Sequence, residues 1–204
     1  MALKKGMLIV FEGIDGSGKS TQAASLIEEL KEKGFDAVYF REPTRGRWGQ
    51  KIKEKALHPG SLSPEEELSL FVKDRKENVK KNLKPALSRK KIVVLDRYYY
   101  STIAYQGARG IDTRRIRKMN EDFVIKPDLV FILDIEPQKG LERIEDRERK
   151  DKLFEQKDYL AKVRKIFKSI KGKNIIHVDG RRPKEKIAEK VEKIVLGHLS
   201  RANV

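Results

Sequence analysis

The sequence predicts an α/β fold in which a parallel sheet of about five strands carries helices on both faces. Two observations predict it. Short apolar runs alternate along the chain with longer amphipathic segments, which is the pattern of successive βαβ units. The first apolar run, residues 7–11, leads directly into a glycine-rich segment and then into a helical pattern.

The five predicted strands are short, continuously apolar runs, as expected for strands covered on both faces. Glycine or Pro-Asp pairs bound several of them, such as Gly6 and Gly13 around the first and Pro127-Asp128 before the fourth. The runs cover residues 7–11, 37–40, 92–95, 129–133 and 175–178.

The predicted helices rest on apolar spacing and on end signals. In residues 19–33 the apolar side chains recur at intervals of three and four, and Gly34 follows where a helix terminates. Ser63-Pro64-Glu65-Glu66 starts a long helix over 63–87, with a bend at Pro85. Further helices are expected over 50–57, 112–125, from Pro137, 158–170 and 183–199.

We expect one domain over residues 1–204, because neither an internal repeat nor an interdomain linker is visible. The almost wholly charged stretch 145–152 is predicted to be a mobile insertion, or lid.

Lysine and arginine number 47 against 31 acidic residues, a formal charge of +16, and charged residues make up 38% of the chain. A nucleic-acid-binding protein is one interpretation. A Lys/Glu-rich enzyme surface is favoured, because basic and acidic residues interleave along the helices, so no stable nucleic-acid partner is expected. The absence of cysteine excludes disulfides and thiol catalysis. The apolar run near the start is too short for a signal peptide or a membrane helix, so a cytoplasmic protein is expected.

Gly13, Gly18, Lys19 and Ser20 match the phosphate-binding pattern G-x-x-x-x-G-K-S, between a strand and a helix as the motif requires. The glycines allow backbone N–H groups to surround phosphates, and the helix N-terminus adds its positive end. Lys19 then reaches the β- and γ-phosphates, and the Ser20 hydroxyl binds Mg²⁺. The expected ATP-binding residues are Gly13, Ile14, Asp15, Gly16, Ser17, Gly18, Lys19, Ser20 and Thr21.

The loop alone does not identify the acceptor. No N-K-x-D tetrapeptide for guanine occurs, and the compact chain favours a kinase for a small acceptor over a motor ATPase. Asp96 and Arg97 follow the third strand, at the sheet edge where ligands bind. Arg97 suits a phosphate clamp and Asp96 suits Mg²⁺ or its waters, although a plain surface pair is the alternative.

Phe71 and Arg75 lie four residues apart on one helical face, an arrangement that stacks a flat base and binds its carbonyl edge. Ser101 and Tyr105 repeat this spacing, with Gln106 adjoining. Taken alone, each of these two aromatic residues, Phe71 and Tyr105, is more often a structural residue of the core.

Together these residues resemble thymidylate kinase, a P-loop nucleoside monophosphate kinase family. The matching motifs are FEGIDGSGKSTQ, REPT, SPEEELSLFVKDRKENV, DRYYYSTIAYQGARGID, PDLVFILD and the later FE. The resemblance implies a three-layer P-loop kinase fold with a short lid, and transfer of the γ-phosphoryl of ATP to dTMP with Mg²⁺. It also implies a homodimer. A related kinase for another nucleotide or nucleoside remains the alternative.

The resemblance implies roles for individual residues. Phe71 stacks on thymine, Arg75 binds its O4 edge and Arg97 holds the acceptor phosphate. Asp15 contacts the 3′-hydroxyl, and Tyr105 crowds the 2′-carbon. The other acceptor-side residues are Glu42, Ser101, Thr102 and Gln106.

Relatives of this type carry glycine in the loop, here Gly16, and supply the transition-state arginine from the lid, about residues 143–153. The candidates are Arg143, Arg147 and Arg149, of which Arg143 is also a candidate to stack on adenine. Thr44-Arg45 departs from the glycine pair common in relatives, and Tyr98-Tyr99-Tyr100 receives no role.

Overall fold

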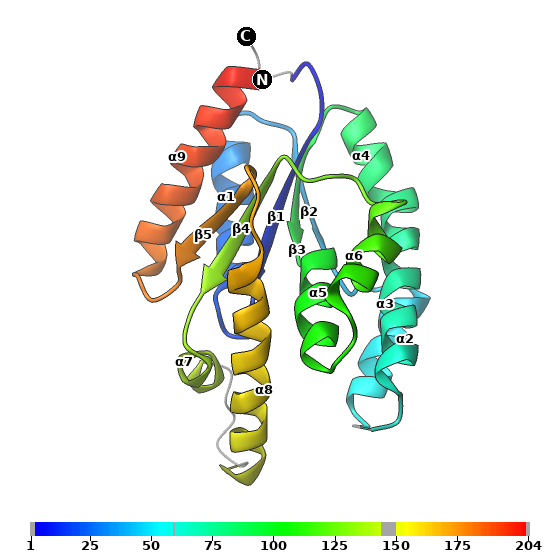
Figure 1. Ribbon diagram of the computed structural model, residues 1–204. Coiled ribbons are helices and arrows are strands. Elements are labelled where there is room, and N and C mark those ends of the chain that lie inside the picture. The colour runs from blue at the N-terminus through cyan, green and yellow to red at the C-terminus, as the bar shows by residue number, and fades with distance from the viewer. Residues whose placement is uncertain (1–2, 59, 144–149, 203–204) are drawn as a thin grey trace.

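A computed structural model describes residues 3–58, 60–143 and 150–202 and contains a five-stranded sheet (Figure 1). The order β2-β3-β1-β4-β5 places β1 in the centre, and every neighbouring pair is parallel. The predicted α/β sheet is therefore confirmed. The strands are β1 (Met7–Gly13), β2 (Ala37–Arg41), β3 (Ile92–Asp96), β4 (Leu129–Asp134) and β5 (Ile175–Asp179).

Helices cover both faces of the sheet, and β1 shows how. Met7, Ile9 and Phe11 pack with α1 (Lys19–Glu32) and α9 (Lys184–Ala202), whereas Leu8 and Val10 belong to the core on the opposite face. That second core includes α3 (Pro64–Asn78), α5 (Tyr99–Ala108) and α8 (Lys150–Ser169). The remaining helices are α2 (Arg47–Ala56), α4 (Lys84–Ser88), α6 (Thr113–Glu121) and α7 (Pro137–Glu142).

The helical path after Ser63 differs from the single bent helix that the sequence predicts. A π-helical turn, η1 (Val79–Leu83), separates α3 from α4, so the irregularity begins before Pro85. Proline lacks an N–H and its ring crowds the preceding turn, and a π turn is one way to accommodate it. The start of α3 matches the prediction: Ser63 and Glu66 form a reciprocal capping box.

Two further differences concern the elements around the site. The sequence pattern did not predict α5, the helix that follows β3. α8 begins at Lys150, inside the stretch predicted as an insertion, and residues 144–149 lie outside the described part of the chain.

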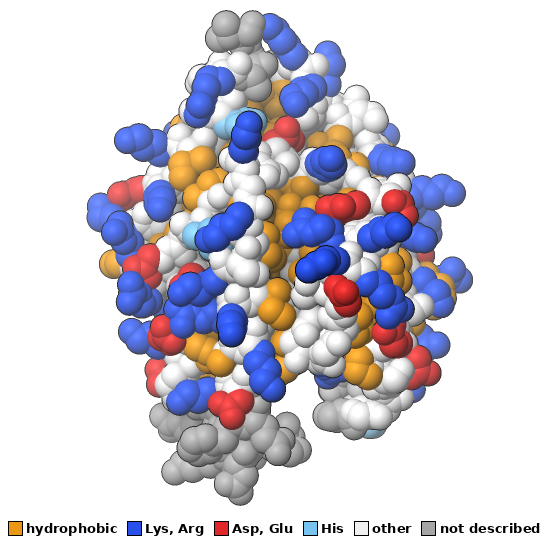
Figure 2. Space-filling model, viewed as in Figure 1, with side chains coloured by type: hydrophobic (Ala, Val, Ile, Leu, Met, Phe, Trp, Pro, Cys, Tyr) orange, Lys and Arg blue, Asp and Glu red, His pale blue; other side chains and the backbone are white. Residues whose placement is uncertain are grey.

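All five strands run in the same direction, so their carboxyl ends meet at one edge. The loop after β1, Arg41 at the end of β2 and Arg97 after β3 therefore lie near one another. Figure 2 shows Lys and Arg spread over the visible face with Asp and Glu between them. Within the described residues, no helix has the length and apolar character needed to span a bilayer.

Candidate active site

The loop between β1 and α1 has the backbone that a phosphate cradle needs. Gly13, Gly16 and Gly18 have φ angles of 138°, 73° and 94°, conformations that side chains disfavour. Gly16 is also packed against α7, because a Cβ there would lie 2.1 Å from the Gly140 carbonyl oxygen. A side chain at position 16 would thus displace α7 as well as strain the loop.

Lys19 lies inside this loop. Its Nζ donates to the Ile14 carbonyl oxygen at 2.7 Å, and only 6% of the residue is exposed. Burial, with the nearby charge of Arg97, lowers the pKa of Lys19 to about 7. A bound phosphate would add negative charge beside this buried side chain and favour its protonated form.

Two cavities adjoin at the carboxyl edge of the sheet. The first, about 510 Å³, is lined by the phosphate loop together with Arg143, Arg182 and Lys184. The second, about 350 Å³, lies between α3, α5 and α8 and is lined by aromatic and polar side chains. Asp15, Arg41 and Arg97 line both cavities and form their common wall.

The common wall is tightly bonded. Arg97 Nη2 pairs with Asp15 Oδ1, and the Tyr105 hydroxyl donates to Asp15 Oδ2 at 2.8 Å. Burial alone would raise the pKa of Asp15, but the charges of Arg97 and Lys19 outweigh it and lower the pKa. Asp15 thus remains ionised and holds the Arg97 guanidinium between the two cavities.

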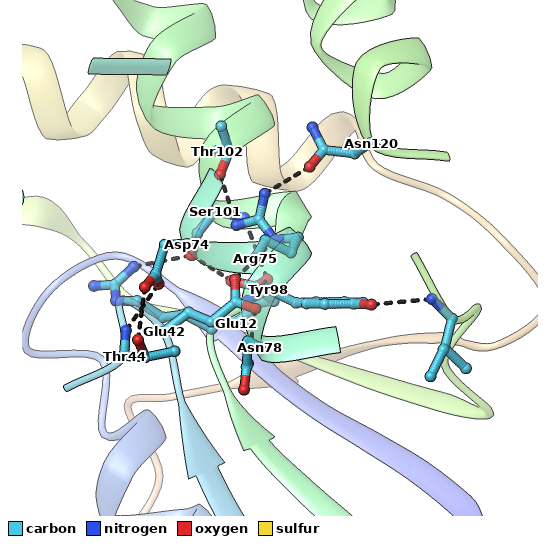
Figure 3. A network of polar contacts seen from close by, with 12 residues as sticks. Glu12, Glu42, Thr44, Asp74, Arg75, Asn78, Tyr98, Ser101, Thr102 and Asn120 are labelled. Atoms are coloured by element: carbon cyan, nitrogen blue, oxygen red, sulfur yellow. Dashed lines mark hydrogen bonds and ion pairs between the residues drawn. The ribbon is translucent and has the colours of Figure 1, made fainter. Parts of the chain in front are cut away.

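A buried ionic network supports the second cavity (Figure 3). The Arg75 guanidinium, 1% exposed, donates from Nε to Glu42 Oε2 at 2.7 Å. Its Nη1 and Nη2 donate to Asn120 and Thr102 at 2.7 and 2.9 Å. Asn78 also donates to Glu42, at 3.0 Å. Arg75 is therefore held by residues from three separate segments, and Glu42 is its buried counter-ion.

The REPT turn is tied to α3 as well. Asp74, 2% exposed, accepts from the Thr44 backbone N–H at 2.8 Å and from its hydroxyl at 2.6 Å. Thr44, which departs from the glycine pair of relatives, thus has a defined partner. The turn that carries Glu42 is anchored one residue away from Arg75.

The aromatic residues divide by environment. Phe71 lines the second cavity and is a member of neither core cluster, so its position favours the base-stacking interpretation over a core role. Tyr105 lines the same cavity while packing against the core. Gln106 is 2% exposed and donates to Glu67 at 2.8 Å, and its Oε1 has no partner among the described residues. That oxygen is a buried acceptor on a residue that lines the cavity.

The residues predicted to bind a metal lie side by side. The Ser20 hydroxyl donates to Asp96 Oδ2 at 2.5 Å, and Asp96 Oδ1 is buried without a partner in the described chain. Hydroxyl and carboxylate oxygens suit Mg²⁺, which takes few protein ligands besides phosphate oxygens and waters. Ser20 is exposed to the first cavity, whereas Asp96 is fully buried behind it. No cluster of three or more His, Cys, Asp or Glu that could hold a metal occurs among the described residues.

Of the three lid arginines, only Arg143 lies within the described residues; Arg147 and Arg149 lie outside them. Arg143 Nη1 donates to the Gly16 carbonyl oxygen at 3.2 Å, and Nη2 donates to that of Gly180 at 3.3 Å. It therefore bridges the phosphate loop and the loop after β5, at the edge of the first cavity.

Several lining residues were not among the predicted site residues: Arg41, Glu67, Arg109 and Tyr159. The sequence does carry a signal for Arg41, since it is the last residue of β2, at the ligand-binding edge. The three consecutive tyrosines are buried. The Tyr98 hydroxyl accepts from the Ile125 N–H at 3.1 Å, and the Tyr99 and Tyr100 rings stack 4.1 Å apart, which gives the triplet a packing role.

Comparison with known proteins identifies the group to which the chain is related. The family model described as thymidylate kinase matches residues 11–191. The chain belongs to the thymidylate kinase family. A protein named probable thymidylate kinase from Archaeoglobus fulgidus is 48% identical over 95% of this chain and 97% of its own length. A thymidylate kinase from Akkermansia muciniphila is 49% identical over 93% and 91%.

A solved structure extends the comparison to the fold. The thymidylate kinase from Ehrlichia chaffeensis matches with a TM-score of 0.74 and 32% identity, covering 93% of this chain and 98% of the other. The family model spans the phosphate loop, the Arg75 network and Arg143. The range matched by the family model therefore contains the residues that line both cavities.

Proposed function

We propose that this chain transfers the γ-phosphoryl group of ATP to dTMP, giving dTDP and ADP. The observation that carries the proposal is the pair of cavities that share Asp15, Arg41 and Arg97. One cavity contains the phosphate loop, and the other offers an aromatic ring, a buried guanidinium and an unpartnered amide oxygen. Phosphoryl transfer from one nucleotide to another needs the two to meet end to end at their phosphates. A shared cationic wall is where those phosphates would meet.

On the donor side, the loop N–H groups and Lys19 bind the β- and γ-phosphates. Ser20 is the residue that would hold Mg²⁺, with Asp96 fixing its hydroxyl from behind. Bound there, Mg²⁺ would neutralise charge on the phosphate oxygens. Arg143, already bonded to the loop carbonyl of Gly16, is placed to contact ATP from the lid side, and Arg147 and Arg149 are further candidates for the transition state.

On the acceptor side, we assign thymine to the second cavity. Phe71 provides a face for stacking, and a guanidinium has five N–H donors, so Arg75 can add a bond to the O4 oxygen. Gln106 Oε1 can accept the N3–H of the base. The α5 side of the cavity is formed by Ser101, Thr102 and Tyr105. Glu42 accepts from Arg75 Nε and so keeps the guanidinium in position.

Arg97 is assigned to the acceptor phosphate. In the structure its guanidinium is paired with Asp15, so we propose that the dTMP phosphate joins or replaces this carboxylate while Asp15 bonds the 3′-hydroxyl. An acceptor phosphate oxygen then attacks the γ-phosphorus, and the bond to the bridging oxygen breaks, releasing ADP. Positive charge at the shared wall stabilises the transferring group.

We further propose that the chain is a single domain that acts as a homodimer, which family membership suggests, and that the reaction takes place in the cytoplasm. Size-exclusion chromatography with light scattering tests the dimer, and a monomer mass at micromolar concentration would contradict it.

An acceptor panel tests the proposed reaction. The full chain is incubated with Mg-ATP and dTMP, dUMP, dCMP, dGMP or thymidine, and ADP release is measured. We expect dTMP to give the highest kcat/KM. A purine nucleotide or thymidine as the best acceptor would show instead a related kinase with another specificity.

A further inference from the structure

Glu12 is a buried acid that belongs to neither the proposed ATP contacts nor the proposed dTMP contacts. It lies in β1, immediately before the phosphate loop, is fully buried, and lines neither of the two cavities. Within the described residues, its carboxylate bonds to the segment where β3 leads into α5, as Figure 3 shows. Oε1 accepts from the backbone N–H groups of Tyr98 and Ser101 at 2.8 and 3.2 Å. Oε2 accepts from the Ser101 hydroxyl at 2.5 Å.

These bonds replace a cap that α5 lacks. The residue before the helix is Tyr98, which makes no side-chain capping bond. The first turn of a helix has unpaired N–H groups and a positive end, which an acidic or hydroxyl side chain normally satisfies from the preceding residue. Here the carboxylate comes from the central strand. The start of α5 is thereby fixed to the strand that carries the phosphate loop.

The Ser101 hydroxyl extends this link to Arg97. Because Ser101 donates its proton to Glu12, its oxygen is left to accept from Arg97 Nη1, 3.0 Å away. Arg97 has a φ angle of 70°, which is uncommon for residues with a side chain, so its conformation needs support from its surroundings. Glu12, Ser101 and Arg97 form one directed chain of hydrogen bonds that ends in the common wall of the cavities.

We propose that Glu12 is a positioning residue for the acceptor nucleotide: from behind the site it sets the Ser101 hydroxyl and, through it, the Arg97 guanidinium. It contacts neither nucleotide. The inference rests on the assignment of dTMP to the second cavity.

A carboxylate at this position is expensive for the fold. Burial raises the pKa of Glu12 to about 7, although Ser101 and the charge of Arg97 oppose the rise. Lys19, Tyr99 and Tyr100 are the other titratable groups that interact with it. The folded pKa lies above the ordinary value of 4.5, so ionisation of Glu12 lowers stability as the pH rises from about 4.5 through 7. If Glu12 contributed to stability alone, a neutral glutamine at this position would make the protein more stable at pH 8.

Glu12→Gln separates positioning from stability. An amide keeps one oxygen for the two backbone N–H groups but presents an NH₂ group to Ser101, so the serine hydroxyl loses its acceptor. At pH 8 we expect the melting temperature to equal or exceed that of the wild type. We expect the affinity for dTMP to fall about tenfold, the size of one charge-assisted hydrogen bond, and that for a non-hydrolysable ATP analogue to change less than about twofold. Both are measured by calorimetric titration of the full chain.

Val10→Ala is the matched control, because Val10 is a buried core residue two positions earlier on the same face of β1. It should lower the melting temperature and leave both affinities unchanged. An unchanged dTMP affinity in Glu12→Gln, or an equal loss for dTMP and the ATP analogue, would overturn the proposal. If Glu12→Gln does not fold, Glu12→Asp, which keeps the charge but falls one methylene short of Ser101, is judged by the same split. Failure of the wild type to bind dTMP would instead contradict the proposed acceptor site.

Discussion

The two cavities share a wall, yet the chain assembles them in different ways. The donor side is dominated by one contiguous loop, Gly13 to Ser20, whose function depends on backbone N–H groups and glycine conformations. The acceptor side is formed by separate side chains from α3, α5, α8 and the segment after β2. Arg75 alone is bonded to Glu42, Thr102 and Asn120, which are widely spaced in the sequence.

The two sites should therefore respond differently to substitutions. A backbone cradle needs little from the rest of the molecule once its strand and helix are in place. A side-chain network in the interior depends on every partner, because removing one leaves another charge buried and unpaired. Donor variants should therefore affect chemistry with little effect on the fold, and acceptor variants should affect binding and stability together.

The largest effect is expected for Lys19→Ala. Its ammonium is the loop's own charge, so phosphoryl transfer should fall by about 10³-fold or more, as on loss of other transition-state charges in phosphoryl transfer. Affinity for dTMP, measured by calorimetry, should stay within about threefold of the wild type. A parallel loss of dTMP binding would show that the two sides are not built independently.

Arg75→Ala should weaken dTMP by about 30-fold or more while ATP affinity changes little. The same change leaves Glu42 buried without its counter-ion, a loss that costs about 3–5 kcal/mol of stability in comparable buried pairs. Calorimetric titration and thermal unfolding measure the two effects.

Arg164→Ala is the control for Arg75→Ala. It breaks ion pairs with Asp134 and Glu136 but lines neither cavity. Its dTMP affinity should remain that of the wild type. Equal losses of dTMP and ATP in Arg75→Ala would contradict a role in reading the base.

Gln106→Ala should cost dTMP about 5- to 10-fold in affinity, because the variant removes one hydrogen-bond acceptor from the cavity wall. Gln106→Glu keeps the shape and the acceptor but places a charge beside Glu67, so it should also bind weakly. Wild-type affinity in Gln106→Ala would remove Gln106 from the base-recognition set.

The smallest effect is expected for Ser63→Ala, which removes the capping box at the start of α3. Loss of one helix cap should lower the melting temperature by about 2–4 °C. Calorimetric affinities for both nucleotides should stay within about twofold, since the capped end lies two turns from Phe71. A selective loss of dTMP would show that the α3 start, too, positions the acceptor site.

The sequence predicts the donor site more completely than the acceptor site. The five strands and the phosphate loop follow from apolar runs and from one short motif, because both are local signals. The sequence does not predict α5, because the apolar and polar residues of YYSTIAYQGA do not separate onto two faces of a helix. The carboxylate that caps this helix belongs to Glu12, which is far away in the sequence. Pro85 predicts a bend in the helix after Ser63, but it does not indicate that the irregularity is a π turn beginning at Val79.

Helical spacing and the family resemblance together predict the acceptor residues, but they do not predict the partners of those residues. The spacing of Phe71 and Arg75 indicates a shared helical face, but it does not reveal that Glu42, Asn120 and Thr102 bond to Arg75. Such contacts depend on tertiary packing. The same holds for Gly16, whose close approach to Gly140 explains the glycine and is visible only in the folded chain.

Whether the shared wall holds the acceptor phosphate is decided by the dTMP-to-thymidine affinity ratio in Arg97→Ala. Thymidine has the same base and sugar but no phosphate, so calorimetric titration of both ligands isolates that group. We predict that Arg97→Ala weakens dTMP by about 30- to 100-fold and thymidine by less than about threefold. Equal weakening of the two ligands would contradict the account.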